Sequence, residues 1–152
     1  MAVDLENLHH MPTIKVAMTP FPFFVDIDAS VAEARAMMRE NEIHHLPVTE
    51  DGALIGVLSA RDVRLLEVSR RGQSNDLGTV RDACVRDVYV VDVDTPLDEV
   101  LLALADAHRG AALVVMKNDK LAGILTTSDV CRLLADLLQQ RFPAPPEDDA
   151  VA

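Results

Sequence analysis

Gly56-Val57-Leu58-Ser59-Ala60-Arg61-Asp62 returns later in the chain as Gly123-Ile124-Leu125-Thr126-Thr127-Ser128-Asp129. Both stretches read as a glycine, two aliphatic residues, a hydroxyl residue, two spacers and an aspartate. A repeated signature indicates the architecture of a chain, because each copy marks one structural unit. The sequence therefore predicts two similar halves, with two candidate ligand sites rather than one active site.

The repeat extends well beyond these two signatures. Residues 26–31, which read Asp-Ile-Asp-Ala-Ser-Val, return as residues 92–97, 66 positions later, whereas the signatures are 67 positions apart. One residue has therefore been inserted between them. We place it in the turn at residues 116–120, because surface turns tolerate insertions.

The apolar pattern predicts the same order of elements, β-α-β-β-α, in both halves. Strands are expected over residues 23–27, 43–48, 53–58, 88–93, 111–116 and 121–125. Ser30 and Glu33 form a capping box that begins the first helix, and a second helix begins after Ser59. Thr95-Pro96 begins the third helix. The last helix is expected over residues 128–140.

These elements divide the chain into five segments. We expect an N-terminal arm over 1–12, a first repeat over 13–68, a polar linker over 69–78, a second repeat over 79–141 and a disordered acidic tail over 142–152. Each repeat would be marginally stable alone, because units of roughly 60 residues bury too little surface. The two halves are therefore expected to fold against each other.

Composition narrows the classes of partner. The 152 residues carry a formal net charge of −11, which disfavours binding to nucleic acid and to anionic membranes. No apolar run reaches the roughly 20 residues of a membrane span. The N-terminus lacks a signal-peptide pattern, so the cytoplasm is the expected compartment. Cys84 and Cys131 have no metal-ligand spacing and are expected to be buried, reduced thiols.

Several further motifs accompany the repeat. They are Val16-Ala17-Met18-Thr19-Pro20, Ile43-His44-His45-Leu46-Pro47-Val48, the turn at Gly52, and the two signatures that end at Asp62 and Asp129. Together they resemble a pair of cystathionine β-synthase (CBS) domains, as found in stand-alone tandem CBS-domain proteins. The resemblance covers residues 14–135. The second half departs from it, with Cys84-Val85-Arg86 and Gly110-Ala111 where the first half has Met18-Thr19-Pro20 and His44-His45.

The resemblance implies an α/β (α+β) fold of tandem β-α-β-β-α repeats related by a pseudo-two-fold axis. It implies a regulatory module that binds an adenosine-containing ligand, such as AMP, ADP, ATP or S-adenosylmethionine, in the cleft between the repeats. It also implies a homodimer, no required cofactor and a regulated protein partner that the residues do not identify. We expect no enzyme activity, because the chain has no catalytic or phosphate-cradling motif.

The signature hydroxyl and aspartate allow two interpretations. Ser59 with Asp62, and Thr126 with Asp129, have the spacing of helix capping boxes and could do nothing more. A helix N-terminus also attracts phosphate through its free amides. The resemblance assigns each aspartate to a ribose and each hydroxyl residue to a position beside the phosphates.

The adjacent histidines make the two candidate sites chemically different. His44 and His45 point to opposite faces of a predicted strand, which disfavours a shared metal. By resemblance, both face the site of Asp129. The site of Asp62 then meets Gly110 and Ala111, which carry no charge, and Arg109 is the nearby substitute. We therefore expect the tighter phosphate site at Asp129.

The complete set of expected ligand-binding residues combines both sites. It comprises Thr126, Asp129, His44, His45, Val85, Ala111, Ser59, Asp62, Arg61, Thr19, Phe23 and Arg109. No metal ligands and no catalytic residues are expected. The alternative is a structural or partner-binding dimerisation protein whose nucleotide sites are degenerate, which the uncharged Gly110-Ala111 pair favours for one site.

Overall fold

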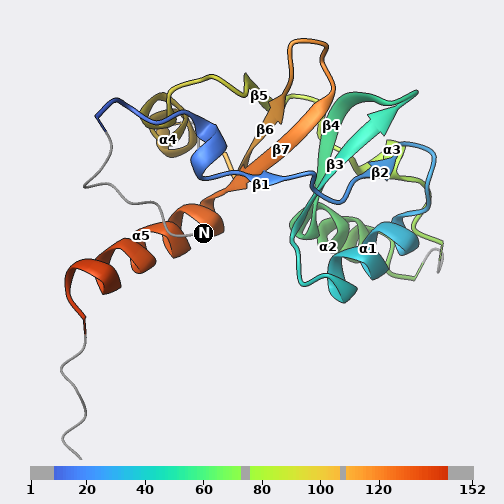
Figure 1. The fold of residues 1–152 in the computed structure, drawn as a ribbon. Helices are drawn as coiled ribbons and strands as arrows, with labels where there is room; N and C mark the ends of the chain where they lie inside the picture. The colour runs from blue at the N-terminus through green and yellow to red at the C-terminus, as the bar shows by residue number, and fades with distance from the viewer. Residues whose placement is uncertain (1–8, 73–75, 107–108, 144–152) are drawn as a thin grey trace, which may run out of the picture.

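The computed structural model describes residues 9–72, 76–106 and 109–143 and divides them between two small sheets with helices (Figure 1). The elements in chain order are η2 (Ile14–Val16), β1 (Thr19–Pro20), β2 (Val25–Asp26), α1 (Val31–Glu40), β3 (His45–Glu50), β4 (Ala53–Ser59), α2 (Ala60–Ser69), α3 (Val80–Ala83), β5 (Tyr89–Asp92), α4 (Leu97–Asp106), β6 (Ala111–Val115), β7 (Leu121–Thr126) and α5 (Thr127–Arg141). The mixed α/β fold class and the repeated β-α-β-β-α order are confirmed.

The two sheets share one plan. In the first, β2 runs parallel to β3 and β3 runs antiparallel to β4. In the second, β5 runs parallel to β6 and β6 runs antiparallel to β7. Helices α1 and α2 lie side by side against the first sheet, and α4 lies against the second (Figure 1). The parallel pairs arise because each connection between them contains a helix, α1 or α4.

Strand register places the one-residue insertion. His45 pairs with Ser59 in the first half, as Ala111 pairs with Thr126 in the second. At the far end of each hairpin Thr49 pairs with Leu54, whereas Val115 pairs with Leu121. The second hairpin therefore carries one more residue in its loop, between Val115 and Leu121. This confirms the insertion that we predicted at residues 116–120.

Each half is completed by a segment from the other half. Strand β1, near the start of the first half, pairs with β7 and adds a fourth strand to the second sheet. Ile14 of η2 is fully buried in the core of the second half. In return, Val80 of α3 is fully buried in the core of the first half. The two cores are therefore interlocked, as their small size requires.

The glycine of each signature lies where a segment from the other half contacts the strand: Val85 at Gly56, and Met18 and Thr19 at Gly123. A Cβ on Gly56 would lie 2.6 Å from the carbonyl oxygen of Val85. A Cβ on Gly123 would lie 2.5 Å from Sδ of Met18 and 3.1 Å from the carbonyl oxygen of Thr19. Only glycine leaves room for these contacts.

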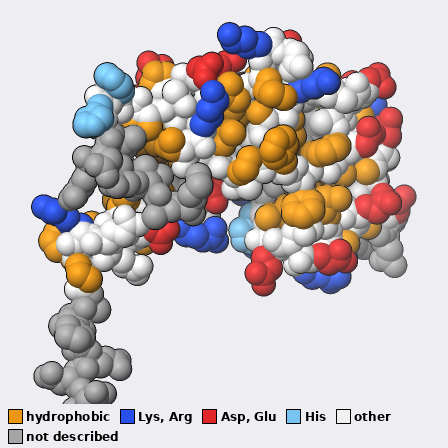
Figure 2. Space-filling model, in the orientation of Figure 1, with side chains coloured by type: hydrophobic (Ala, Val, Ile, Leu, Met, Phe, Trp, Pro, Cys, Tyr) orange, Lys and Arg blue, Asp and Glu red, His pale blue; other side chains and the backbone are white. Residues whose placement is uncertain are grey.

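Both cores are aliphatic, as the scarcity of aromatic residues predicts. The face shown in Figure 2 carries apolar side chains in the middle of the view and acidic side chains towards the right edge.

Helix α5 contains no buried residue, and in Figure 1 it extends away from the rest of the molecule. Cys84 is half-buried and Cys131, on α5, is exposed. The expectation of a buried thiol is therefore wrong for Cys131, because little of the fold covers this helix.

Three expectations fall partly outside the described residues. They concern residues 1–8 of the arm, 73–75 of the linker and 144–152 of the tail. Among the helices that the structure does describe, none has the length and apolar character needed to cross a bilayer.

Candidate functional site

Both signatures form capping boxes at strand-to-helix junctions. Ser59 caps α2: the backbone amide of Asp62 donates to Ser59 Oγ at 3.1 Å, and the Ser59 amide donates to Asp62 Oδ2 at 3.0 Å. Thr126 caps α5 in the same way, with distances of 3.2 Å and 2.9 Å to its partner Asp129. The predicted caps are confirmed, and they hold each aspartate at the N-terminus of a helix.

Each capping carboxylate uses only one of its oxygens in the cap. Oδ2 of Asp62 accepts from both the amide and the hydroxyl of Ser59, and Oδ2 of Asp129 accepts in the same way from Thr126. The described residues form no hydrogen bond to either Oδ1 atom, although Oδ1 of Asp129 has Arg132 Nη1 at 3.7 Å. A carboxylate can therefore cap its helix and still accept a hydrogen bond from a ligand.

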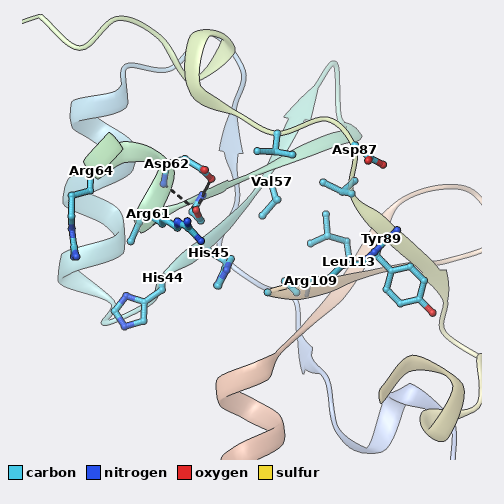
Figure 3. Close-up of a pocket in the computed structure, with 16 residues that line it drawn as sticks. His44, His45, Val57, Arg61, Asp62, Arg64, Asp87, Tyr89, Arg109 and Leu113 are labelled. Atoms are coloured by element: carbon cyan, nitrogen blue, oxygen red, sulfur yellow. Dashed lines mark hydrogen bonds between the residues drawn. The ribbon is translucent and has the colours of Figure 1, made fainter. Parts of the chain in front are cut away.

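A cavity of about 570 Å³ lies beside Asp62, and we call it the Asp62 pocket (Figure 3). It is lined by His44, His45, Val57, Ser59, Ala60, Arg61, Asp62, Arg64, Val85, Asp87, Val88, Tyr89, Arg109, Gly110, Ala111 and Leu113. In Figure 3, Arg61 and His45 approach it from the first half, and Arg109 and Tyr89 from the second. Its volume lies within the roughly 300–1,000 Å³ range of small-molecule sites.

Positive charge is concentrated in the Asp62 pocket. Three arginines line it, Arg61, Arg64 and Arg109, against two aspartates. None of the three forms a salt bridge with any other described residue. The Arg109 guanidinium lies 5.1 Å from the ring centroid of Tyr89, and the resulting cation–π attraction favours this position of the arginine. The pocket therefore offers guanidinium groups that are free to bind an anion.

A second cavity, of about 410 Å³, lies beside Asp129, and we call it the Asp129 pocket. It is lined by Thr19, Pro20, Phe21, Pro22, Phe23, Glu42, Ile43, His44, His45, Ile124, Thr126, Ser128, Asp129 and Arg132. It contains a single arginine, Arg132, and two carboxylates, Glu42 and Asp129. Two of its non-glycine residues have positive φ, +48° at Phe21 and +54° at Glu42.

The two histidines contribute to both cavities. His44 is exposed and His45 is half-buried, and both line the Asp62 pocket as well as the Asp129 pocket. They were expected to face Asp129 alone. The structure adds the second contact because His45 Nε2 lies 2.9 Å from where a Cβ on Gly110 would be. The absence of a side chain at Gly110 lets His45 lie between the two pockets.

Burial decides the protonation of His45. It lowers the pKa of His45, and repulsion from His44 lowers it further, while the carboxylates of Asp62 and Asp129 act in the opposite direction. With a pKa below the usual 6.5, the ring is neutral at pH 7. At that pH His45 offers a ligand a hydrogen bond and no charge. The arginines therefore decide which pocket is more positive: three line the Asp62 pocket, whereas only Arg132 lines the Asp129 pocket.

Every residue in the expected ligand-binding set lines one of the two cavities. The Asp62 pocket receives Ser59, Asp62, Arg61, Arg109, Ala111 and Val85, the Asp129 pocket receives Thr126, Asp129, Thr19 and Phe23, and His44 and His45 reach both. Sequence reasoning missed Arg64, Tyr89, Phe21, Glu42 and Arg132. For Phe21 a signal existed, because the chain has only four phenylalanines and three of them fall within residues 21–24. Among the described residues, no cluster of His, Cys, Asp or Glu could hold a metal ion.

Comparison with known proteins identifies two copies of one family. The family model for the CBS domain matches residues 14–68 and again residues 80–136. A zinc metalloprotease, MJ0392 of Methanocaldococcus jannaschii, is 30% identical over 135 residues, which are 89% of this chain and 36% of that protein. Inosine-5'-monophosphate dehydrogenase of Staphylococcus epidermidis is 32% identical, over 74% of this chain and 22% of that enzyme. The chain thus spans about a third or less of these relatives.

Solved structures share the fold over most of the chain. An acetoin utilization protein (AcuB) from Vibrio cholerae superposes with a TM-score of 0.76 at 25% identity, covering 90% of this chain and all of that one. The protein CBSX2, solved in complex with AMP, gives a TM-score of 0.70 at 28% identity, covering 82% and 97%. The CBS domain pair of MJ0100, solved with 5'-methylthioadenosine and S-adenosyl-L-methionine, gives 0.73 at 22% identity, covering 83% and 98%.

Proposed function

This chain belongs to the CBS-domain family, and from that premise we propose that its two domains form a regulatory module that binds adenosine-containing ligands in the two pockets. The observation that carries this proposal is the oxygen of each capping carboxylate that takes no part in the cap. Oδ1 of Asp62 and of Asp129 is held at a helix N-terminus beside a cavity. Such an oxygen can accept hydrogen bonds from the hydroxyl groups of a ribose.

The phosphates of a nucleotide belong, on this proposal, in the Asp62 pocket. Arg61, Arg64 and Arg109 supply guanidinium groups that match phosphate oxygens in geometry and charge. The ranking expected from the histidines is thereby reversed, because His45 is neutral and shared. AMP in the structure of CBSX2, at 28% identity, supports an adenosine nucleotide as the ligand class.

Ligand binding would act on the arrangement of the two halves. The Asp62 pocket takes Arg61 from the first half and Arg109 from the second. A ligand that contacts both favours the arrangement in which both contacts are made, and this shifts the population of conformations. The module would pass that shift to a regulated partner without catalysing a reaction itself.

We also propose that the protein forms a homodimer through its helices. Apolar side chains are exposed on α5, where Leu134 is 56% and Leu138 is 51% accessible, and on α2, where Leu65 is 59% accessible. Apolar helix faces left uncovered in one subunit usually mark an interface. A two-fold dimer covers the same face of both copies. We propose, in addition, a cytoplasmic protein, and the net charge of −11 supports only that it avoids nucleic acid and anionic membranes.

Calorimetric titration with ATP, ADP and AMP tests the proposed function. The wild-type chain should bind ATP, and Asp62→Ala should weaken binding roughly 10- to 100-fold, since a hydrogen bond to a charged group contributes about 1.5–3 kcal/mol. Asp136→Ala, on the exposed part of α5, is the matched control and should bind ATP as the wild type does. Thermal melts of all three proteins separate lost contacts from the lost cap, which costs about 1 kcal/mol.

The rival function predicts a different result. A structural dimerisation protein with degenerate sites would stay dimeric and bind none of the three nucleotides. That outcome would overturn the proposed ligand binding and leave the dimer standing.

A further inference from the structure

The repeat allows the two pockets to be compared position by position. Residues before the inserted turn correspond at an offset of 66, and residues across it at 67. The structure supports this correspondence at Thr19 and Val85, because Thr19 pairs with Ile124 in the second half as Val85 pairs with Val57 in the first. Differences at equivalent positions therefore report on the ligand of each pocket.

The charges of the Asp62 pocket are replaced at equivalent positions of the Asp129 pocket. Arg61 corresponds to Ser128, Arg109 to Ile43, Asp87 to Phe21 and Tyr89 to Phe23. At these positions the Asp129 pocket has neutral residues in place of two arginines and a phenylalanine in place of an aspartate. The remaining cation, Arg132, already faces the carboxylate of Asp129 at 3.7 Å.

Two strained residues border the Asp129 pocket. Phe21 has a φ of +48° and Glu42 a φ of +54°, a region that bulky residues rarely adopt. Phe21 is 85% exposed, so packing of its side chain within this chain does not offset the cost of the backbone strain. Glu42 takes this conformation as the residue after the C-cap of α1, where the Ile43 amide donates to the Met38 carbonyl oxygen at 2.9 Å. Phe21 follows strand β1 instead, and strained residues outside helix ends are concentrated at ligand sites. An exposed aromatic ring beside a cavity is suited to stack on a flat heterocycle.

We propose that the Asp129 pocket binds an adenosine ligand that has no phosphate, with an uncharged or positively charged 5' substituent such as a thioether, and that Phe21 stacks on its base. This inference rests on the proposed function, since it assumes that the ribose meets Asp129. A phosphate here would lie near Glu42 and Asp129 with only one arginine, which is already engaged. The two pockets of one chain are therefore selective for different adenosine ligands.

The first experiment titrates 5'-methylthioadenosine into wild-type protein saturated with ATP. Binding of one 5'-methylthioadenosine per chain, with the same affinity as without ATP, is the expected result. Displacement of one ligand by the other would overturn the inference while leaving the proposed function intact. Failure of every adenosine ligand to bind would overturn the proposed function and this inference together.

The second experiment replaces the ring. Phe21→Asn should lower the affinity for 5'-methylthioadenosine about 10-fold, from lost base stacking, and leave ATP binding unchanged. Asparagine tolerates positive φ, so the melting temperature should not fall. Phe24→Ala is the matched control, because Phe24 is 57% exposed and lines neither pocket. Unchanged affinity for 5'-methylthioadenosine in Phe21→Asn, or an equal loss in Phe24→Ala, would refute the role of Phe21.

Discussion

The carbonyl oxygen of Val85 lies 2.6 Å from the position that a Cβ would take on Gly56. This contact joins the two halves, because the backbone amide of Val85 also donates to the carbonyl oxygen of Val57 at 2.9 Å, and the Val57 amide donates back to Val85 at 3.0 Å. The glycine that begins the signature is therefore required for the assembly of the halves. The hydroxyl residue and the aspartate of the same signature, Ser59 and Asp62, line the Asp62 pocket.

Replacement of this glycine should destabilise the protein more than replacement of a pocket glycine. Gly56→Ala would push against the backbone of Val85, which cannot move alone, so we expect a loss of about 1–3 kcal/mol in the free energy of unfolding. Gly110→Ala meets the movable ring of His45 instead and should cost less. Urea denaturation of both variants measures the difference. Equal losses of unfolding free energy in the two variants would show that the backbone around Val85 can move to accommodate a Cβ on residue 56.

The arginine beside Tyr89 should discriminate between nucleotides and nucleosides. Arg109→Ile gives the Asp62 pocket the residue found at the equivalent position of the other pocket. Because charge-assisted contacts to phosphate are lost, we expect affinity for ATP to fall roughly 10-fold or more. Affinity for 5'-methylthioadenosine should not change. Arg86→Ala, which removes an exposed arginine outside both pockets, is the control for net charge in the same calorimetric titrations.

Stability should depend on pH through His45. Burial lowers the pKa of His45, so the unfolded chain takes up a proton at a higher pH than the folded protein does. The free energy of unfolding should therefore fall as the pH drops below about 6.5, the unfolded value, until the folded value is reached. Melting curves between pH 7.5 and 5.5 should show a smaller fall for His45→Gln than for the wild type. His9→Gln, which replaces an exposed histidine, is the control in the same measurement.

A charge on the apolar stripe of α5 should dissociate the dimer without unfolding the subunit. Leu134 is 56% exposed and no residue of α5 is buried, so Leu134→Glu removes little from the core. Light scattering at tens of micromolar should show a dimer for the wild type and a smaller species for Leu134→Glu. The control is Gln139→Glu, five positions along the helix and on the opposite side from the stripe. A monomeric wild-type protein would contradict the dimer and leave the ligand pockets unaffected.

The sequence alone determined the features that depend on local chemistry. The caps at Ser59 and Thr126 involve residues only three positions apart. The repeat and its turn insertion follow from comparing the two copies at offsets of 66 and 67, which needs no knowledge of the packing. Capping needs only a hydroxyl and a carboxylate three positions apart, so it can be predicted without knowing what packs against the helix. The candidate residues followed from the same signatures and from the resemblance they carry.

Only the tertiary structure decided how the halves combine and where the charges meet. The exchange of β1 and α3 depends on packing between segments far apart in the chain. The same is true of the position of His45 between the two pockets. The expectation that Asp129 is the tighter phosphate site rests on His44 and His45 and stays a prediction, because the sequence shows neither burial nor distance. Burial lowers the pKa of His45, and three arginines line the Asp62 pocket, because electrostatic interactions depend on position in space rather than on order along the chain.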